Sequence, residues 1–135
     1  MPLIEFENVG VTFDTSTGQR TVLQDINLSL DERRIGIIGA NGSGKSTLVR
    51  LINGLAEPTS GHVRVAGLDV AKSGRQVRRK VGFVFSDADN QIIMPTVAED
   101  VAFSLRATSM NSQERKERAA AMLRTMGLEL SLIHI

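Results

Sequence analysis

Gly39-Ala40-Asn41-Gly42-Ser43-Gly44-Lys45-Ser46-Thr47 is the stretch that decides the fold of this 135-residue chain. It matches the pattern G-x-x-x-x-G-K-[ST], a glycine-rich loop that cradles the phosphates of a nucleotide. The apolar run 34–38 predicts a buried strand before the loop. After the loop, apolar residues recur at helical spacing: Leu48, Leu51, Ile52 and Leu55. Strand, loop and helix in this order predict an α/β fold and form the arrangement that a phosphate-binding loop needs.

The loop has the chemistry needed to hold a polyphosphate. Glycines let backbone N–H groups approach the anion without a Cβ in the way, and a run of such groups forms an anion-binding nest. The free N–H groups and the dipole at the start of the next helix add to the attraction. We expect Lys45 to contact the β- and γ-phosphates, Ser46 to bind Mg²⁺ and Thr47 to bond the α-phosphate. The whole loop, Gly39 to Thr47, is therefore predicted to bind the nucleotide.

Two other interpretations of the loop fit less well. A glycine-rich turn that binds nothing would not need Lys45 and Ser46 at the offsets that phosphate and metal binding require. A dinucleotide-binding turn needs G-x-G-x-x-G or a final Ala, whereas the stretch 42–47 ends in Thr.

Length and composition narrow the class of protein. A chain of 135 residues makes at most one small domain. The net charge of +1 does not favour bulk electrostatic binding, so no nucleic acid partner is expected. The absence of cysteine rules out disulfides and thiolate chemistry and is typical of cytosolic proteins. No apolar run approaches the roughly 18 residues of a membrane span, and the first residues lack the pattern of a secretory signal.

The remaining sequence predicts further strands and helices around the loop. Alternating apolar residues and turn signals predict strands at 3–9, 22–30, 62–65 and 81–85. Capping-box patterns at Thr96 and Asn111 predict helices over 96–107 and from 111 to Gly127. The helix after the loop is expected to span 45–53 and to stop at Gly54.

With these elements placed, the chain resembles an ATP-binding cassette (ABC) ATPase. Two antiparallel-looking strands precede the loop, whereas small nucleotide kinases usually carry it on their first strand. In the cassette family an aromatic residue between these strands stacks on adenine, and Phe13 would be that residue. The resemblance implies an α/β fold of the P-loop NTPase type, with an antiparallel β subdomain at the N-terminal end and truncated before the second half of the domain. Phe13 could instead be a plain core aromatic.

A second stretch, from Val84 to Phe103, resembles a loop and helix of energy-coupling-factor transporter ATPases. These proteins drive the uptake of vitamins, cobalt or nickel, and the biotin-uptake branch is the nearest match. The resemblance implies ATP and Mg²⁺ as cofactors and a second ATPase subunit. It also implies a transmembrane coupling subunit and a substrate-binding membrane subunit. The protein would then sit peripherally on the cytoplasmic face of the plasma membrane.

This second stretch departs from the family at one position and carries an apolar patch. The family usually has Gln directly after Val-Phe, where it reaches Mg²⁺; here Ser86 would be a shorter ligand. Gln91 matches a second family glutamine that faces the membrane partner. The apolar residues after it predict an exposed patch for a partner, with Gln91, Ile92 and Met94 as contacts. The alternative is an ordinary loop packed on its own domain.

The family's hydrolytic parts are missing from the sequence. Phosphoryl transfer needs a carboxylate for Mg²⁺ and a group that orients water, yet neither an apolar strand ending in Asp-Glu nor the signature Leu-Ser-Gly-Gly-Gln is found. We therefore expect no catalytic residues here, and residues 1–129 to form the N-terminal part of a nucleotide-binding domain. The tail 130–135 breaks from the family pattern and resembles a translated adapter fragment. Three functions stay open: a transport ATPase, an ATP–Mg²⁺-binding fragment without hydrolysis, and a soluble nucleotide kinase.

Overall fold

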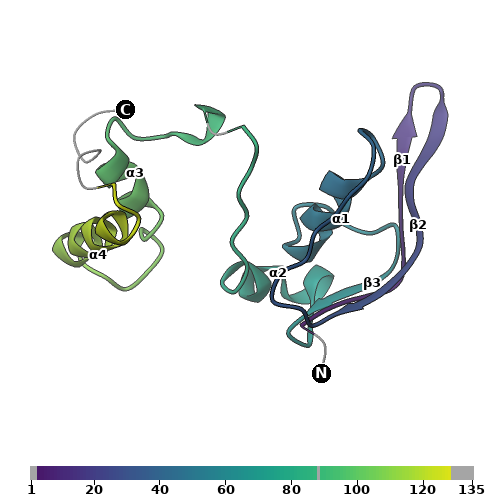
Figure 1. Ribbon diagram of the computed structural model, residues 1–135, viewed down its shortest axis with the longest axis horizontal. Helices are drawn as coiled ribbons and strands as arrows, with labels where there is room; N and C mark the ends of the chain where they lie inside the picture. The colour runs from purple at the N-terminus through teal and green to yellow at the C-terminus, as the bar shows by residue number, and fades with distance from the viewer. Residues whose placement is uncertain (1–2, 88, 129–135) are drawn as a thin grey trace. The chain divides into compact units, whose positions relative to one another are not determined.

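The computed structural model describes residues 3–87 and 89–128. The chain divides into two compact units, Met1–Val84 and Phe85–Ile135. The first unit contains a β-sheet with two helices, and the second contains two further helices (Figure 1). The predicted boundary at residue 129 and the tail 130–135 lie outside the described residues.

The first unit is built on a four-stranded antiparallel sheet in the order β2-β1-β3-β4. Strands β1 (Ile4–Thr15) and β2 (Gly18–Leu30) form a long hairpin, followed by β3 (Ser60–Val65) and the short β4 (Leu68–Asp69). The hairpin turn needs a residue with positive φ, which Gly18 supplies at 122°. The predicted N-terminal antiparallel sheet is confirmed, and its first two strands are longer than the sequence indicated.

A bulge in β1 brings three apolar side chains to one face. The pairing of β1 with β2 shifts register between Phe6 and Val9 and again after Val9, and Asn8 adopts a positive φ of 49°. Strict alternation would send Phe6 and Val9 to opposite faces. The extra residue of the bulge corrects this, so Phe6, Val9 and Val11 are all buried.

Helices α1 (Lys45–Ile52) and α2 (Val70–Arg78) belong to the same core as the sheet. Helix α1 agrees with its predicted bounds, and Gly54 follows it with a φ of 72°. Helix α2 was not predicted; its signal is Asp69, whose carboxylate caps it by accepting the Lys72 N–H at 3.2 Å. The buried core consists of Phe6, Val9, Val11, Leu23, Leu51, Val63, Val65, Val70 and Val77.

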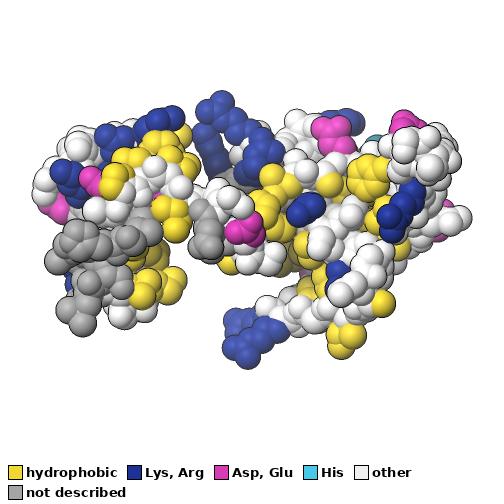
Figure 2. Space-filling view, turned by 90° about the horizontal axis from the view of Figure 1, so that it is seen from above, with side chains coloured by type: hydrophobic (Ala, Val, Ile, Leu, Met, Phe, Trp, Pro, Cys, Tyr) yellow, Lys and Arg dark blue, Asp and Glu magenta, His cyan; other side chains and the backbone are white. Residues whose placement is uncertain are grey.

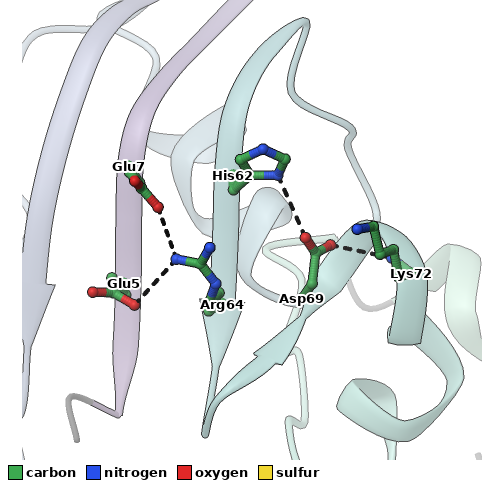
Figure 3. A network of polar contacts seen from close by, with 6 residues as sticks. All are labelled: Glu5, Glu7, His62, Arg64, Asp69 and Lys72. Atoms are coloured by element: carbon green, nitrogen blue, oxygen red, sulfur yellow. Dashed lines mark hydrogen bonds and ion pairs between the residues drawn. The ribbon is translucent and has the colours of Figure 1, made fainter.

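Charged side chains tie β1 to β3 on the polar side of the sheet (Figure 3). Arg64 lies opposite Glu5 in the register. Its guanidinium donates to Glu7 at 2.8 Å and approaches Glu5 at 3.5 Å. The hydrogen bond and charge of Glu7 raise the pKa of Arg64 above its usual value. His62 Nδ1 lies 3.4 Å from the same Asp69 carboxylate that caps α2.

Two predicted buried strands are absent from the described part of the chain. Residues 34–38 and 81–85 take no strand conformation, and Ile38 and Val84 are 100% and 96% exposed. A strand forms only where a neighbour accepts and donates its backbone hydrogen bonds, and neither segment pairs with β1 to β4. Both predictions were wrong for this structure. Apolar side chains accordingly reach the surface (Figure 2).

The second unit contains a short 3₁₀ turn, η1 (Asp89–Gln91), and helices α3 (Val97–Phe103) and α4 (Ser112–Thr125). Both predicted helix starts are confirmed. The Thr96 hydroxyl accepts the Glu99 N–H at 3.2 Å and donates to its carboxylate at 2.8 Å. Asn111 makes a complete capping box with Glu114.

Helix α3 differs from its prediction in where it ends. Helix α3 ends four residues before the predicted limit, where the Ser104 hydroxyl bonds back to the Val101 carbonyl at 2.7 Å. On α4, Leu123 is buried and Met122 is exposed. Within the described ranges, no helix has both the length and the apolar character needed to cross a bilayer.

Candidate nucleotide-binding site

A cavity of about 450 Å³ lies in the first unit, between the β1–β2 hairpin and the glycine loop. The hairpin contributes Phe13, Thr15, Arg20 and Val22, and the loop contributes residues 41–47. The structure therefore brings Phe13 together with Lys45, Ser46 and Thr47, although more than 30 positions of sequence separate them.

The backbone at the start of α1 is shaped for an anion. Gly44 is the N-cap of the helix, with a left-handed φ of 93°, and no side chain caps the helix. A Cβ at Gly44 would lie 2.9 Å from Leu23 Cδ2 and 3.0 Å from the Val22 carbonyl, so the loop can pack against β2 only with glycine here. The first turn of α1 carries no acidic residue. Its free N–H groups and positive dipole end are left for a negatively charged ligand.

The Lys45 side chain closes the loop on itself. Its ammonium donates to the carbonyls of Gly39 and Ala40, each at 2.7 Å, and lies 3.4 Å from the Ser43 hydroxyl. These bonds hold the positive charge beside the cavity that Lys45 lines. A phosphate entering the cavity would meet an ammonium already held in place, which lowers the entropy cost of forming a charge-assisted bond.

The hydroxyls of Ser46 and Thr47 line the same cavity. Ser46 is exposed, and neither hydroxyl bonds to another residue of the described ranges. Mg²⁺ is held by hard oxygen ligands and usually keeps several waters, so one hydroxyl plus phosphate oxygens forms a suitable site. The donors present thus fit a Mg²⁺–polyphosphate ligand.

Phe13 lies on β1 directly opposite Arg20 of β2. Its side chain is 48% exposed and lines the cavity. The alternative that Phe13 is a core aromatic does not agree with this exposure. An aromatic face open to a cavity is a suitable surface on which a purine can stack.

The other predicted site residues, Ser86, Gln91, Ile92 and Met94, belong to the second unit. Their segment is anchored to α3, because Asp100 Oδ1 accepts the N–H groups of Ile93 and Met94 at 2.9 and 3.0 Å. Gln91 Nε2 donates to the Asp87 carbonyl at 3.0 Å. The side chains of Ile92 and Ile93 are exposed. The backbone of the segment is therefore anchored and Ile92 and Ile93 remain accessible, whereas Met94 is half-buried.

Sequence reasoning missed three residues that line the cavity: Thr15, Arg20 and Val22. Arg20 fell outside the strand predicted to begin at residue 22, because the polar sequence before it resembles a loop. The signal that could have found it is alternation: residues 18, 20 and 22 of one strand share a face.

Comparison with known proteins places the chain in a family. The family model described as ABC transporter matches residues 23–133. A relative from Bartonella quintana, provisionally named an ABC transporter ATP-binding protein, is 47% identical over 129 residues, or 96% of this chain and 55% of the relative. The biotin transport ATP-binding protein BioM of Rhizobium etli is 44% identical over 93% of this chain and 54% of the length of BioM. The methionine import ATP-binding protein MetN 2 of Enterococcus faecalis is 41% identical over 96% of this chain and 39% of the length of MetN 2.

Solved structures share the fold. CbiO1 of Clostridium perfringens, described as part of the ABC transporter complex CbiONQ, superposes with a TM-score of 0.77 at 28% identity, covering 97% of this chain and 53% of CbiO1. An ATP-binding cassette solved as a dimer with ADP and Pi gives a TM-score of 0.80 at 28% identity, over 97% of this chain and 60% of the cassette. The chain thus spans about half the length of the proteins it matches. With this match to the family model and relatives above 40% identity across nearly all of its length, the chain belongs to the ABC transporter family of ATP-binding proteins.

Proposed function

We propose that this chain is the nucleotide-binding part of an energy-coupling-factor-type ATPase subunit that drives uptake of a vitamin or metal ion. The observation that carries the proposal is the cavity in which the glycine loop and Lys45 face the exposed ring of Phe13. One end of it is suited to phosphates and the other to a purine, so ATP is the ligand it fits best.

Each residue of the site has a separate role in this proposal. Backbone N–H groups of the loop and Lys45 hold the β- and γ-phosphates, and Thr47 bonds the α-phosphate. The Ser46 hydroxyl binds Mg²⁺, and the resemblance in sequence makes Ser86 a candidate for a further ligand. Mg²⁺, when bound, neutralises charge on the phosphates and orients them.

Hydrolysis of ATP needs catalytic groups that the family supplies in two motifs, and neither motif occurs in this sequence. An acidic residue to hold Mg²⁺ and a group to orient water are required, and the family's Asp-Glu strand and Leu-Ser-Gly-Gly-Gln signature are absent from this sequence. We therefore propose that the 135-residue chain binds ATP–Mg²⁺ without turning it over, and that hydrolysis belongs to the full-length subunit.

The second unit supplies the proposed contact with the membrane. The exposed segment with Gln91, Ile92 and Met94 is proposed to meet a transmembrane coupling subunit, which itself joins a substrate-binding membrane subunit. CbiO1, described as part of an ABC transporter complex, supports membrane partners, and the cassette solved as a dimer supports a second ATPase subunit. The protein would then act at the cytoplasmic face of the membrane. Biotin and methionine both occur in the names of relatives, so the cargo stays open.

Equilibrium dialysis of the 135-residue chain with ATP, ADP and GTP, with Mg²⁺ or with EDTA, tests the proposal. We expect one saturable ATP site with a Kd on the order of micromolar and weaker binding in EDTA. Release of phosphate should stay at the rate of a protein-free control. The absence of saturable ATP binding would overturn the proposal, and phosphate release above the control would overturn its non-hydrolytic part.

Replacing Phe13 with Ala is expected to weaken ATP binding about tenfold, because stacking of a base on an aromatic side chain contributes roughly 1–3 kcal/mol. Phe13→Tyr keeps the ring and should bind within about twofold of the parent, a difference of about 0.4 kcal/mol. Fluorescence titration with a labelled ATP measures both variants. Unchanged affinity in the Ala variant would show that the ring does not contact the base.

A further inference from the structure

Arg20 occupies a distinctive place in the nucleotide cavity. It pairs directly with Phe13 across the β1–β2 hairpin. Directly paired residues of an antiparallel sheet point to the same face, and both residues line the cavity. The cavity thus has an aromatic ring and a guanidinium side by side on its hairpin wall.

The Arg20 guanidinium is not committed elsewhere within the described ranges. No ion pair or hydrogen bond of the described residues involves its side chain, in contrast to Lys45, whose ammonium is bonded to two loop carbonyls. The cation–aromatic contact found in the described residues joins Arg106 to Phe103, in the second unit, so Arg20 does not cover the ring of Phe13. An exposed guanidinium without a partner keeps its five donors free for a ligand.

The position of Arg20 along β2 indicates which end of a nucleotide it would meet. Two β2 residues, Leu23 and then Val22, lie next to the loop, since Leu23 Cδ2 and the Val22 carbonyl are 2.9 and 3.0 Å from where a Cβ of Gly44 would be. Arg20 lies two residues further along the strand, which is roughly 6.5 Å at the usual rise per residue. It is therefore displaced from the phosphate-binding amides toward the level of Phe13, where the base and ribose are proposed to lie.

We infer that Arg20 is a nucleotide-contacting residue that, beside Phe13 on the same wall of the cavity, holds the base and ribose of bound ATP. The inference rests on the proposed binding of ATP in this cavity. A planar guanidinium can pack against a purine face and at the same time donate hydrogen bonds to ribose or purine acceptors. Arg20 would add affinity for nucleosides that the glycine loop, which reads only phosphates, does not provide.

The test compares ATP with inorganic tripolyphosphate, which has the phosphates but neither base nor ribose. In isothermal titration of the 135-residue chain with Mg²⁺, Arg20→Gln should weaken ATP and ADP binding about five- to tenfold, a loss of about 1–1.4 kcal/mol. Tripolyphosphate binding should change less than about twofold. Arg20→Lys keeps the charge without the planar group and should recover less than half of the lost free energy.

Arg79→Gln is the matched control, because Arg79 is exposed and lies at the end of α2 rather than at the cavity. Arg79→Gln should leave the affinity for both ligands unchanged. Unchanged ATP affinity in Arg20→Gln would overturn the inference alone, whereas a parent chain that binds no ATP would overturn the proposed function with it. An equal loss of affinity for ATP and for tripolyphosphate would overturn the assignment of Arg20 to the base and ribose. If Arg20→Gln did not fold, a selective loss of ATP binding in Arg20→Lys would support the inference and its absence would refute it.

Discussion

Replacing Lys45 with Ala is expected to lower the affinity for ATP–Mg²⁺ at least about 100-fold. Hydrogen bonds to charged groups contribute roughly 1.5–3 kcal/mol each, and the ammonium is proposed to contact both the β- and the γ-phosphate. The same substitution removes the donor that bonds the carbonyls of Gly39 and Ala40 at 2.7 Å. The loop would lose both its charge and the side chain that holds it closed.

Titration with ATP–Mg²⁺ and with tripolyphosphate measures this loss, and both ligands should be affected alike because Lys45 acts on phosphates. Lys72→Ala is the control, because it removes the same charge from the chain. Lys72 is exposed on α2 and does not line the cavity. The affinity of the Lys72→Ala variant for both ligands should stay within about twofold of the parent, a difference in binding free energy of about 0.4 kcal/mol. An equal decrease in the two variants would mean that net charge, rather than the loop, governs binding.

The features that the sequence predicted well are those made by residues close together in the chain. The glycine loop, the start of α1 and the capping of α3 and α4 each depend on contacts within a few positions, as in the bonds between Asn111 and Glu114. Such local chemistry can be recognised from residue type and spacing alone. The part of the candidate site that the glycine loop forms could be located for the same reason, and its binding of phosphate stays a prediction.

The features that it missed depend on partners distant in sequence. Residues 34–38 are apolar enough for a buried strand, yet apolar character does not provide a neighbouring strand, and Ile38 is fully exposed in this structure. The bulge near Asn8 and the pairing of Arg20 with Phe13 follow from the register of the hairpin. Register is set by the turn and by the buried face together, so neither feature could be predicted from a single strand.

The core of the first unit positions the candidate site through helix α1. The core of the first unit lies between the antiparallel sheet and helices α1 and α2. Helix α1 carries the glycine loop at its N-terminal end, so the loop is held in place by the apolar side chains that anchor the helix. Leu51, in the last turn of α1, is 1% exposed and is the largest fully buried side chain of this core. Stability and nucleotide binding should therefore depend on it together.

Leu51→Ala is expected to lower the free energy of unfolding of the first unit by about 2–4 kcal/mol, because it removes buried methyl groups and leaves a cavity. Leu55→Ala makes the same chemical change three residues after α1, where the side chain is 47% exposed, and should cost less than about 1 kcal/mol. Native-state hydrogen exchange of amides in β1 measures the opening of this unit separately from the second. Equal acceleration of exchange in the two variants would show that α1 is not anchored through Leu51. A selective effect, accompanied by weaker ATP binding in Leu51→Ala alone, would show that the loop depends on the buried end of its helix.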